Sequence, residues 1–133
     1  MDIESDLKDL QAKLVDDVIK IANILHVTLD YSHESIKGID QILDVVGKDF
    51  RAKKDNQGLE GVALQCAAYI VTVIEAHLEK GEWRRDDKEF GKDTFPYFWR
   101  GKVLYPFIWC RKQIEVGEAE SVWSKYMTLV LEN

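Results

Sequence analysis

Residues 59–80, LEGVALQCAAYIVTVIEAHLEK, decide the fold of this 133-residue chain. Their apolar positions recur at helical spacing, and in the first half the apolar arc extends almost all the way round the helix. The most apolar part, residues 62–74, would be about 20 Å long as a helix, which is shorter than a ~30 Å hydrocarbon layer. We therefore expect a buried helix in the centre of the fold, ended by Gly81, and no membrane span.

Two further helices are predicted before this central one. Apolar residues at spacings of three and four predict a first helix over residues 3–25. A second helix starts near Ser32, because Asp30 or Ser32 can accept hydrogen bonds from the first free backbone amides. Gly47 is expected to end it in the left-handed conformation, and the polar residues 48–58 to form a loop. Its buried stripe should consist of Ile36, Ile39, Leu43 and Val46.

The helical period is lost after Gly81, and short β-strands are predicted instead. Residues 82–85 read as one strand, followed by a charged turn. Residues 94–105 read as a hairpin whose two-residue turn is Gly101-Lys102, which would pair Phe98 with Tyr105. Because proline cannot donate to a ladder, Pro96 places the first hairpin strand at a sheet edge or at a bulge.

The C-terminal part returns to helix. Pro106 suits the first position of a helix that runs to Val116 and ends at Gly117. A last helix is expected over residues 118–131. Because nothing repeats and no linker separates parts, we predict one α+β domain over residues 1–133.

Composition and charge restrict the class of function. Hydrophobic residues make up 46% and charged residues 32% of the chain, which excludes a disordered tail. The net charge of −6 disfavours a nucleic-acid partner, which needs a basic field, and favours a basic protein partner. The N-terminus lacks the apolar region of a signal peptide, so Cys66 and Cys110 are expected to be reduced, buried thiols in a cytoplasmic protein.

Several short motifs occur from residue 29 onward: Leu29-Asp30-Tyr31-Ser32 followed by Ser35-Ile36, Ala68-Tyr69-Ile70, Gly81-Glu82-Trp83, Tyr105-Pro106-Phe107 and Gly117-Glu118-Ala119-Glu120. Together they resemble the pattern of a family of uncharacterised bacterial domains. The likeness covers about 100 residues, but its motifs mark the ends of helices and strands and carry no chemistry, and that family has no assigned activity. It therefore implies a fold and no function. The chain departs from the family pattern at Cys66-Ala67-Ala68, where such domains often carry glycines.

Motifs for catalysis, metals and cofactors are weak in this sequence. Cys66 and His77 share one face of the central helix but would lie about 16 Å apart, so they cannot form a nucleophile–base dyad. There is no C-x-x-C or H-E-x-x-H spacing, and no glycine-rich phosphate loop. We expect no metal site and no cofactor.

Aromatic crowding is the strongest compositional anomaly, since eight of the 14 aromatic residues fall between positions 90 and 109. Strand alternation places Phe95, Tyr97 and Trp99 on one face of the hairpin and Phe98 on the other. Either all these rings belong to the core, or some stay exposed and bind a protein partner. The second interpretation leads to a non-enzymatic interaction protein, such as an immunity-type inhibitor or an adaptor, in which Trp99→Ala weakens binding with little loss of stability. Its partner-binding residues would be Phe95, Tyr97, Trp99, Asp86 and Asp87.

Two alternatives remain open. The first is an enzyme or small-ligand binder, with a pocket between the central helix and the hairpin that uses Tyr69, Glu75 and His77. The second is a homodimer formed through the first helix, whose apolar series almost fits a heptad pattern.

Overall fold

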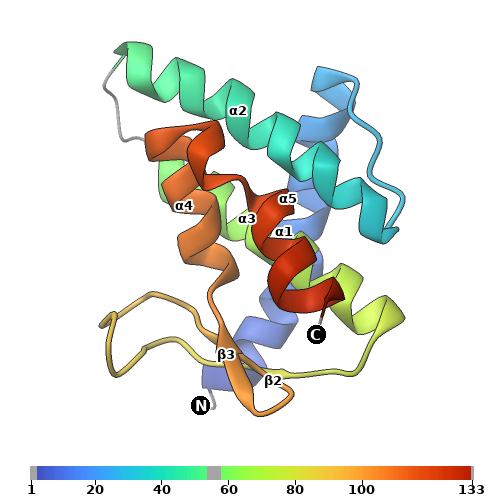
Figure 1. Cartoon of the computed structure of the whole chain (residues 1–133), viewed down its shortest axis with the longest axis vertical. Helices are drawn as coiled ribbons and strands as arrows, with labels where there is room; N and C mark the ends of the chain where they lie inside the picture. The colour runs from blue at the N-terminus through green and yellow to red at the C-terminus, as the bar shows by residue number, and fades with distance from the viewer. Residues whose placement is uncertain (1–2, 54–57, 133) are drawn as a thin grey trace.

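Helix α3 (Leu59–His77) runs through the middle of the computed structural model, with α1 (Ile3–Leu25) and α4 (Pro106–Val116) packed against it (Figure 1). The structure describes residues 3–53 and 58–132, with side chains from Lys8 onward. Six consecutive residues of α3, 66–71, are buried, which confirms the prediction of a central apolar helix. By length and composition α3 could also cross a membrane, but 56% of its apolar window is buried inside this fold.

The second helix extends further than the sequence predicted. A 3₁₀ turn, η1 (His33–Ser35), leads into α2 (Ile36–Lys53), and the Ser32 hydroxyl caps it by accepting from the Ser35 amide at 3.1 Å. The capping prediction is confirmed, whereas the expected stop at Gly47 is wrong. Gly47 lies inside α2, where an added Cβ would lie 2.9 Å from the carbonyl oxygen of Ile114 in α4. Close packing between two helices therefore requires this glycine.

The polar residues after Gly47 are divided between α2 and the part of the chain outside the described residues. Residues 48–53 belong to α2, so the expected loop is wrong there. Residues 54–57 of that loop lie outside the described residues. In α2, Ile36, Ile39 and Leu43 are buried as predicted, whereas Val46 is half-buried.

Three short antiparallel strands form one sheet in the order β1 (Glu82–Trp83), β2 (Tyr97–Trp99), β3 (Lys102–Leu104). The hairpin turn is Arg100-Gly101, one residue earlier than predicted, and both residues have positive φ (51° and 73°). Two left-handed residues give the turn type whose twist matches that of the flanking strands. Phe98 consequently pairs with Val103, and the expected pairing with Tyr105 is wrong.

Strand β2 is central, so the expectation that Pro96 marks a sheet edge is wrong. Pro96 lies just before the strand, where its missing N–H removes no bond from the ladder, and its carbonyl accepts from Arg84 N at 2.9 Å. Gly81 does not end α3, which stops at His77. An added Cβ at Gly81 would lie 2.8 Å from the Tyr97 ring and nearer still to the Phe98 carbonyl, so this glycine permits close approach to the sheet.

The C-terminal segment closes the fold over α2 and α4. Helix α4 has the predicted bounds, and Gly117 follows it with φ 108°. A 3₁₀ turn, η2 (Glu118–Glu120), then leads to α5 (Val122–Tyr126), which continues as a π turn, η3 (Met127–Leu131). The Asp40 carboxylate of α2 accepts from the amides of Val122 and Trp123 at 3.0 and 3.2 Å. The result is one α+β domain with helices first, as predicted.

Candidate functional site

The rings expected to bind a partner lie mostly in the core. Tyr97 and Trp99 are each 1% exposed, because the inner face of the hairpin packs on the helices together with Leu104. The Tyr97 hydroxyl accepts from Gly81 N at 2.6 Å, and burial raises the pKa of Tyr97 to about 12. The Trp99 indole donates to the carbonyl of Glu79 at 2.9 Å. The exposure that the binding hypothesis required is therefore absent for Tyr97 and Trp99.

Phe95, the third of these rings, is half-buried. It has φ 48° and packs edge-on against Phe107, with ring centroids 5.3 Å apart. Phe95 thus joins the edge of the core and presents only part of its ring to solvent.

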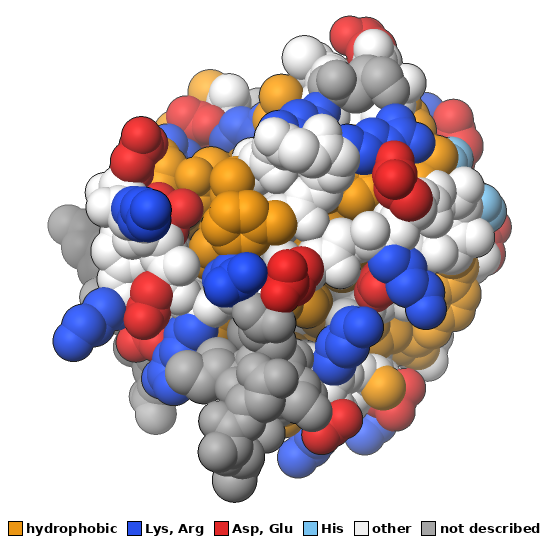
Figure 2. Space-filling view, turned by 90° about the horizontal axis from the view of Figure 1, so that it is seen from below, with side chains coloured by type: hydrophobic (Ala, Val, Ile, Leu, Met, Phe, Trp, Pro, Cys, Tyr) orange, Lys and Arg blue, Asp and Glu red, His pale blue; other side chains and the backbone are white. Residues whose placement is uncertain are grey.

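The opposite face of the hairpin carries a different set of hydrophobic side chains. Phe98 is 40% exposed and lies directly across from half-buried Val103. Tyr105, two residues beyond Val103, contacts Phe90 edge-on at 4.8 Å, and Phe90 is 52% exposed. We call these four residues the outer hairpin face. Figure 2 looks at this end of the molecule and shows hydrophobic side chains gathered there among basic and acidic ones.

Acidic groups flank one end of the outer hairpin face. Asp87 accepts from the amides of Glu89 and Phe90 at 2.7 and 3.0 Å, and these bonds hold the pKa of its carboxyl below the ordinary value. The other oxygen of Asp87 accepts from the Tyr105 hydroxyl at 3.0 Å. Burial, then the hydrogen bond to Asp87 and the charges of Asp87 and Glu89, raise the pKa of Tyr105. Asp86 accepts from the amide of Asp93 at 2.9 Å, so both predicted aspartates also hold the turn together.

Arg84 is one basic component of this surface. The guanidinium of Arg84 lies over the Phe98 ring, 5.4 Å from its centroid, and 3.4 Å from the carboxylate of Glu82. The Phe98 ring therefore already has the Arg84 cation over its face, whereas Phe90 and Tyr105 lie beside the Asp87 carboxylate.

Two residues of the alternative pocket, Tyr69 and His77, meet at the backbone of Tyr31, and Glu75 lies apart from them. Tyr69 and His77, both on α3, hold the backbone of Tyr31: the Tyr31 amide donates to the Tyr69 hydroxyl at 2.9 Å, and Nε2 of His77 donates to the Tyr31 carbonyl at 2.7 Å. The Tyr69 hydroxyl also bonds the Ser35 hydroxyl at 2.7 Å, and burial raises the pKa of Tyr69. These contacts lie at the junction of α3 with the α1–α2 connection.

A second histidine extends this polar cluster. The rings of His33 and His77 lie 4.7 Å apart between centroids, and Nδ1 of His33 shares a hydrogen bond of 2.6 Å with the Tyr126 hydroxyl. Burial, then the neighbouring His77, lower the pKa of His33. Burial also raises the pKa of Tyr126, so both partners of the bond favour their neutral forms.

Glu75 lines a groove of about 430 Å³ between α1 and α3, where the sequence predicted a pocket between α3 and the hairpin. The lining residues of this groove lie on α1, on α3, at Tyr31 and at Lys80, because α1 packs along this side of α3. Sequence reasoning missed Gln11 and Tyr31, which also line the groove. Gln11 is a polar residue within the apolar series of α1, which is the one signal in the sequence that could have identified it.

The cysteines are buried thiols near one another at the α3–α4 contact. Cys66 and Cys110 are both free and fully buried, and burial, then the neighbouring Cys66, raise the pKa of Cys110 well above its ordinary value. In the parts of the chain that the structure describes, no three His, Cys, Asp or Glu side chains are grouped as a metal site would require.

Comparisons with known proteins found no matching family model, no matching curated protein and no matching solved structure.

Proposed function

We propose that this protein is a non-enzymatic binding domain whose outer hairpin face docks a basic segment of a protein partner. One observation carries the proposal: two hydrophobic pairs on one face of the hairpin, Phe98 with Val103 and Phe90 with Tyr105, form a strip that the fold leaves partly exposed. Aromatic side chains bury large areas on association at little entropic cost, and clusters of them mark interaction surfaces.

The carboxylates at the Phe90–Tyr105 end of the strip support a basic partner. The chain carries a net charge of −6, and Asp87 and Glu89 lie close enough to Tyr105 to raise its pKa. A lysine or arginine of the partner would gain both the faces of the Phe90 and Tyr105 rings and the field of these two carboxylates. The overall negative field would also accelerate the encounter with a basic protein.

An inhibitor of a basic toxin, or an adaptor, is the concrete form of this proposal. We propose that it acts in the cytoplasm, and two buried free thiols suit a reducing compartment.

A photo-crosslinking residue placed at Phe90 in the native cells tests the proposal. Val45 on α2 is the matched control position, because it is 50% exposed against 52% for Phe90. A protein cross-linked from Phe90 and not from Val45 identifies the partner. Equal cross-linking from both positions would count against the outer hairpin face.

Binding measurements with the purified partner then complete the test. Phe90→Ala and Phe98→Ala should each raise the Kd about tenfold or more, since central aromatic contacts typically exceed 1 kcal/mol. Val45→Ala should leave the Kd unchanged. If neither aromatic substitution changes the Kd, the partner binds elsewhere and the proposal is wrong.

A further inference from the structure

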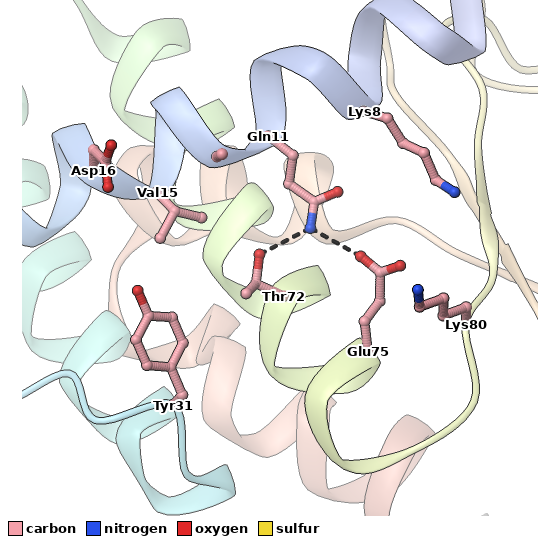
Figure 3. A pocket seen from close by; sticks show the side chains of 9 residues that line it. Lys8, Gln11, Val15, Asp16, Tyr31, Thr72, Glu75 and Lys80 are labelled. Carbon is pink, nitrogen blue, oxygen red and sulfur yellow. Dashed lines mark hydrogen bonds between the residues drawn. The ribbon is translucent and has the colours of Figure 1, made fainter.

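The groove between α1 and α3 has the chemistry of a small-ligand site, independent of the outer hairpin face. Its volume of about 430 Å³ lies within the range of small-molecule sites. Figure 3 shows side chains from three segments converging on it: α1, α3 with the residue Lys80 that follows it, and the connection that carries Tyr31.

A hydrogen-bond network around the side-chain amide of Gln11 lies in the middle of the groove. The amide nitrogen of Gln11 donates to the Thr72 hydroxyl at 2.8 Å and to Oε1 of Glu75 at 2.9 Å. The amide oxygen of Gln11 accepts from the indole of buried Trp83 at 3.1 Å, so all the polar atoms of the amide are engaged. Gln11 engages only Oε1 of Glu75, and within the described part of the chain Oε2 keeps its capacity to bind a ligand.

Tyr31 forms a wall of the groove in a conformation that a tyrosine rarely adopts. Its φ is 65°, in the left-handed region, and its backbone is held from both sides by Tyr69 and His77. The ring packs on Tyr69 at 5.4 Å but stays 37% exposed toward the groove. Strained residues held by their surroundings cluster at ligand sites, which points to binding as the role of this wall.

The charges of the groove are separated along its length. Lys8 and Lys80 bring their ammonium groups to the end where the Glu75 carboxylate lies (Figure 3). Asp16 lies at the other end, on the side of the Tyr31 hydroxyl (Figure 3). Asp16 follows Gln11 by five residues of α1, which is about 7.5 Å along the helix. Apolar surface from Ala12 and Val15 lies between the two ends.

From this arrangement we propose that the groove binds an α-amino acid whose side chain ends in a cation. The ligand carboxylate lies between Lys8 and Lys80, and its α-ammonium group donates to Oε2 of Glu75. The aliphatic part of its side chain packs along Val15. Its terminal cation reaches Asp16 and the face of the Tyr31 ring, where charge and ring quadrupole both attract it.

Calorimetric titration of the full chain with three small molecules tests the class of ligand. L-Arginine should bind with a Kd of about 1 mM or tighter. L-Leucine, which lacks the terminal cation, and agmatine, which lacks the carboxylate, should each bind at least tenfold more weakly. Equal binding of leucine would refute the role of Asp16 and Tyr31, and equal binding of agmatine would refute the role of the lysines. No heat with any of the three would overturn the proposal.

Two variants test whether arginine binds in the groove between α1 and α3. Glu75→Gln keeps the oxygen that Gln11 engages and removes the charge, so it should weaken arginine binding tenfold or more while the melting temperature stays unchanged. Asp49→Asn is the matched control, since it removes one negative charge from the exposed face of α2. If both variants bind arginine equally, the ligand lies outside this groove and the inference is wrong.

Discussion

The side of the hairpin that faces water can be tested by two adjacent substitutions, Trp99→Ala and Phe98→Ala. Neighbouring residues of a strand point to opposite faces, and Trp99 is 1% exposed while Phe98 is 40% exposed. Replacing a buried tryptophan by alanine typically costs about 3–5 kcal/mol in the free energy of unfolding. The change at Phe98 removes a side chain that is partly in water already, so it should cost about 1 kcal/mol.

For a chain of this length, 1 kcal/mol corresponds to roughly 4 °C in Tm. We therefore expect Trp99→Ala to lower Tm by about 12–20 °C and Phe98→Ala by about 4 °C. Far-UV circular dichroism during thermal and urea unfolding measures both changes without depending on tryptophan fluorescence. Equal losses, or a larger loss at Phe98, would mean that the strand register is shifted by one residue. The outer hairpin face would then be buried, and the proposed binding function would fail with it.

Three further predictions follow from particular contacts. Gly47→Ala forces α2 away from α4 and should lower the free energy of unfolding by about 1–2 kcal/mol. At Gly61 an added Cβ meets nothing within 4 Å, so Gly61→Ala should raise the free energy of unfolding by about 0.5–1 kcal/mol. The urea midpoints of the two variants check both values. Cys66 and Cys110 should react with a thiol-specific disulfide reagent only when the protein unfolds, because both are fully buried and a raised pKa keeps the Cys110 thiol protonated. Reaction of the native protein at the rate of a free thiol would contradict this. The free energy of unfolding should fall as the pH drops below about 6.5. Burial and a neighbouring imidazole lower the pKa of folded His33, so the unfolded chain takes up the proton first. His33→Gln should remove this part of the pH dependence, and an unchanged slope of unfolding free energy against pH would refute the explanation.

The candidate surfaces could be predicted from the sequence only in part. Aromatic crowding singled out residues 90–109 as the candidate segment, and alternation separated Phe98 from Tyr97 and Trp99 correctly. Both faces of the hairpin carry rings, however, so the pattern itself could not tell which face the helices would cover. The covered face carries Tyr97 and Trp99, which are buried in the core. We therefore move the partner-binding proposal to Phe90, Phe98 and Tyr105.

The residues of the groove could also be predicted from the sequence only in part. Tyr69, Glu75 and His77 were candidates for a pocket between the central helix and the hairpin. Only the tertiary structure brings Gln11 onto Glu75 and places Tyr31 between Tyr69 and His77. No spacing in the sequence predicts contacts between residues that lie 38–64 positions apart.

The sequence by itself determined the elements whose cause is local. Helix α1, the apolar α3 and the span of α4 follow from periodicity and from residues such as Pro106 and Gly117 at their ends, because these effects act over one or two helical turns. Tertiary structure decided the rest. Helix α2 continues past Gly47 because α4 crosses it there, and the hairpin face left in water depends on which side the helices cover. Such outcomes depend on the packing of distant segments, which short-range sequence patterns do not encode.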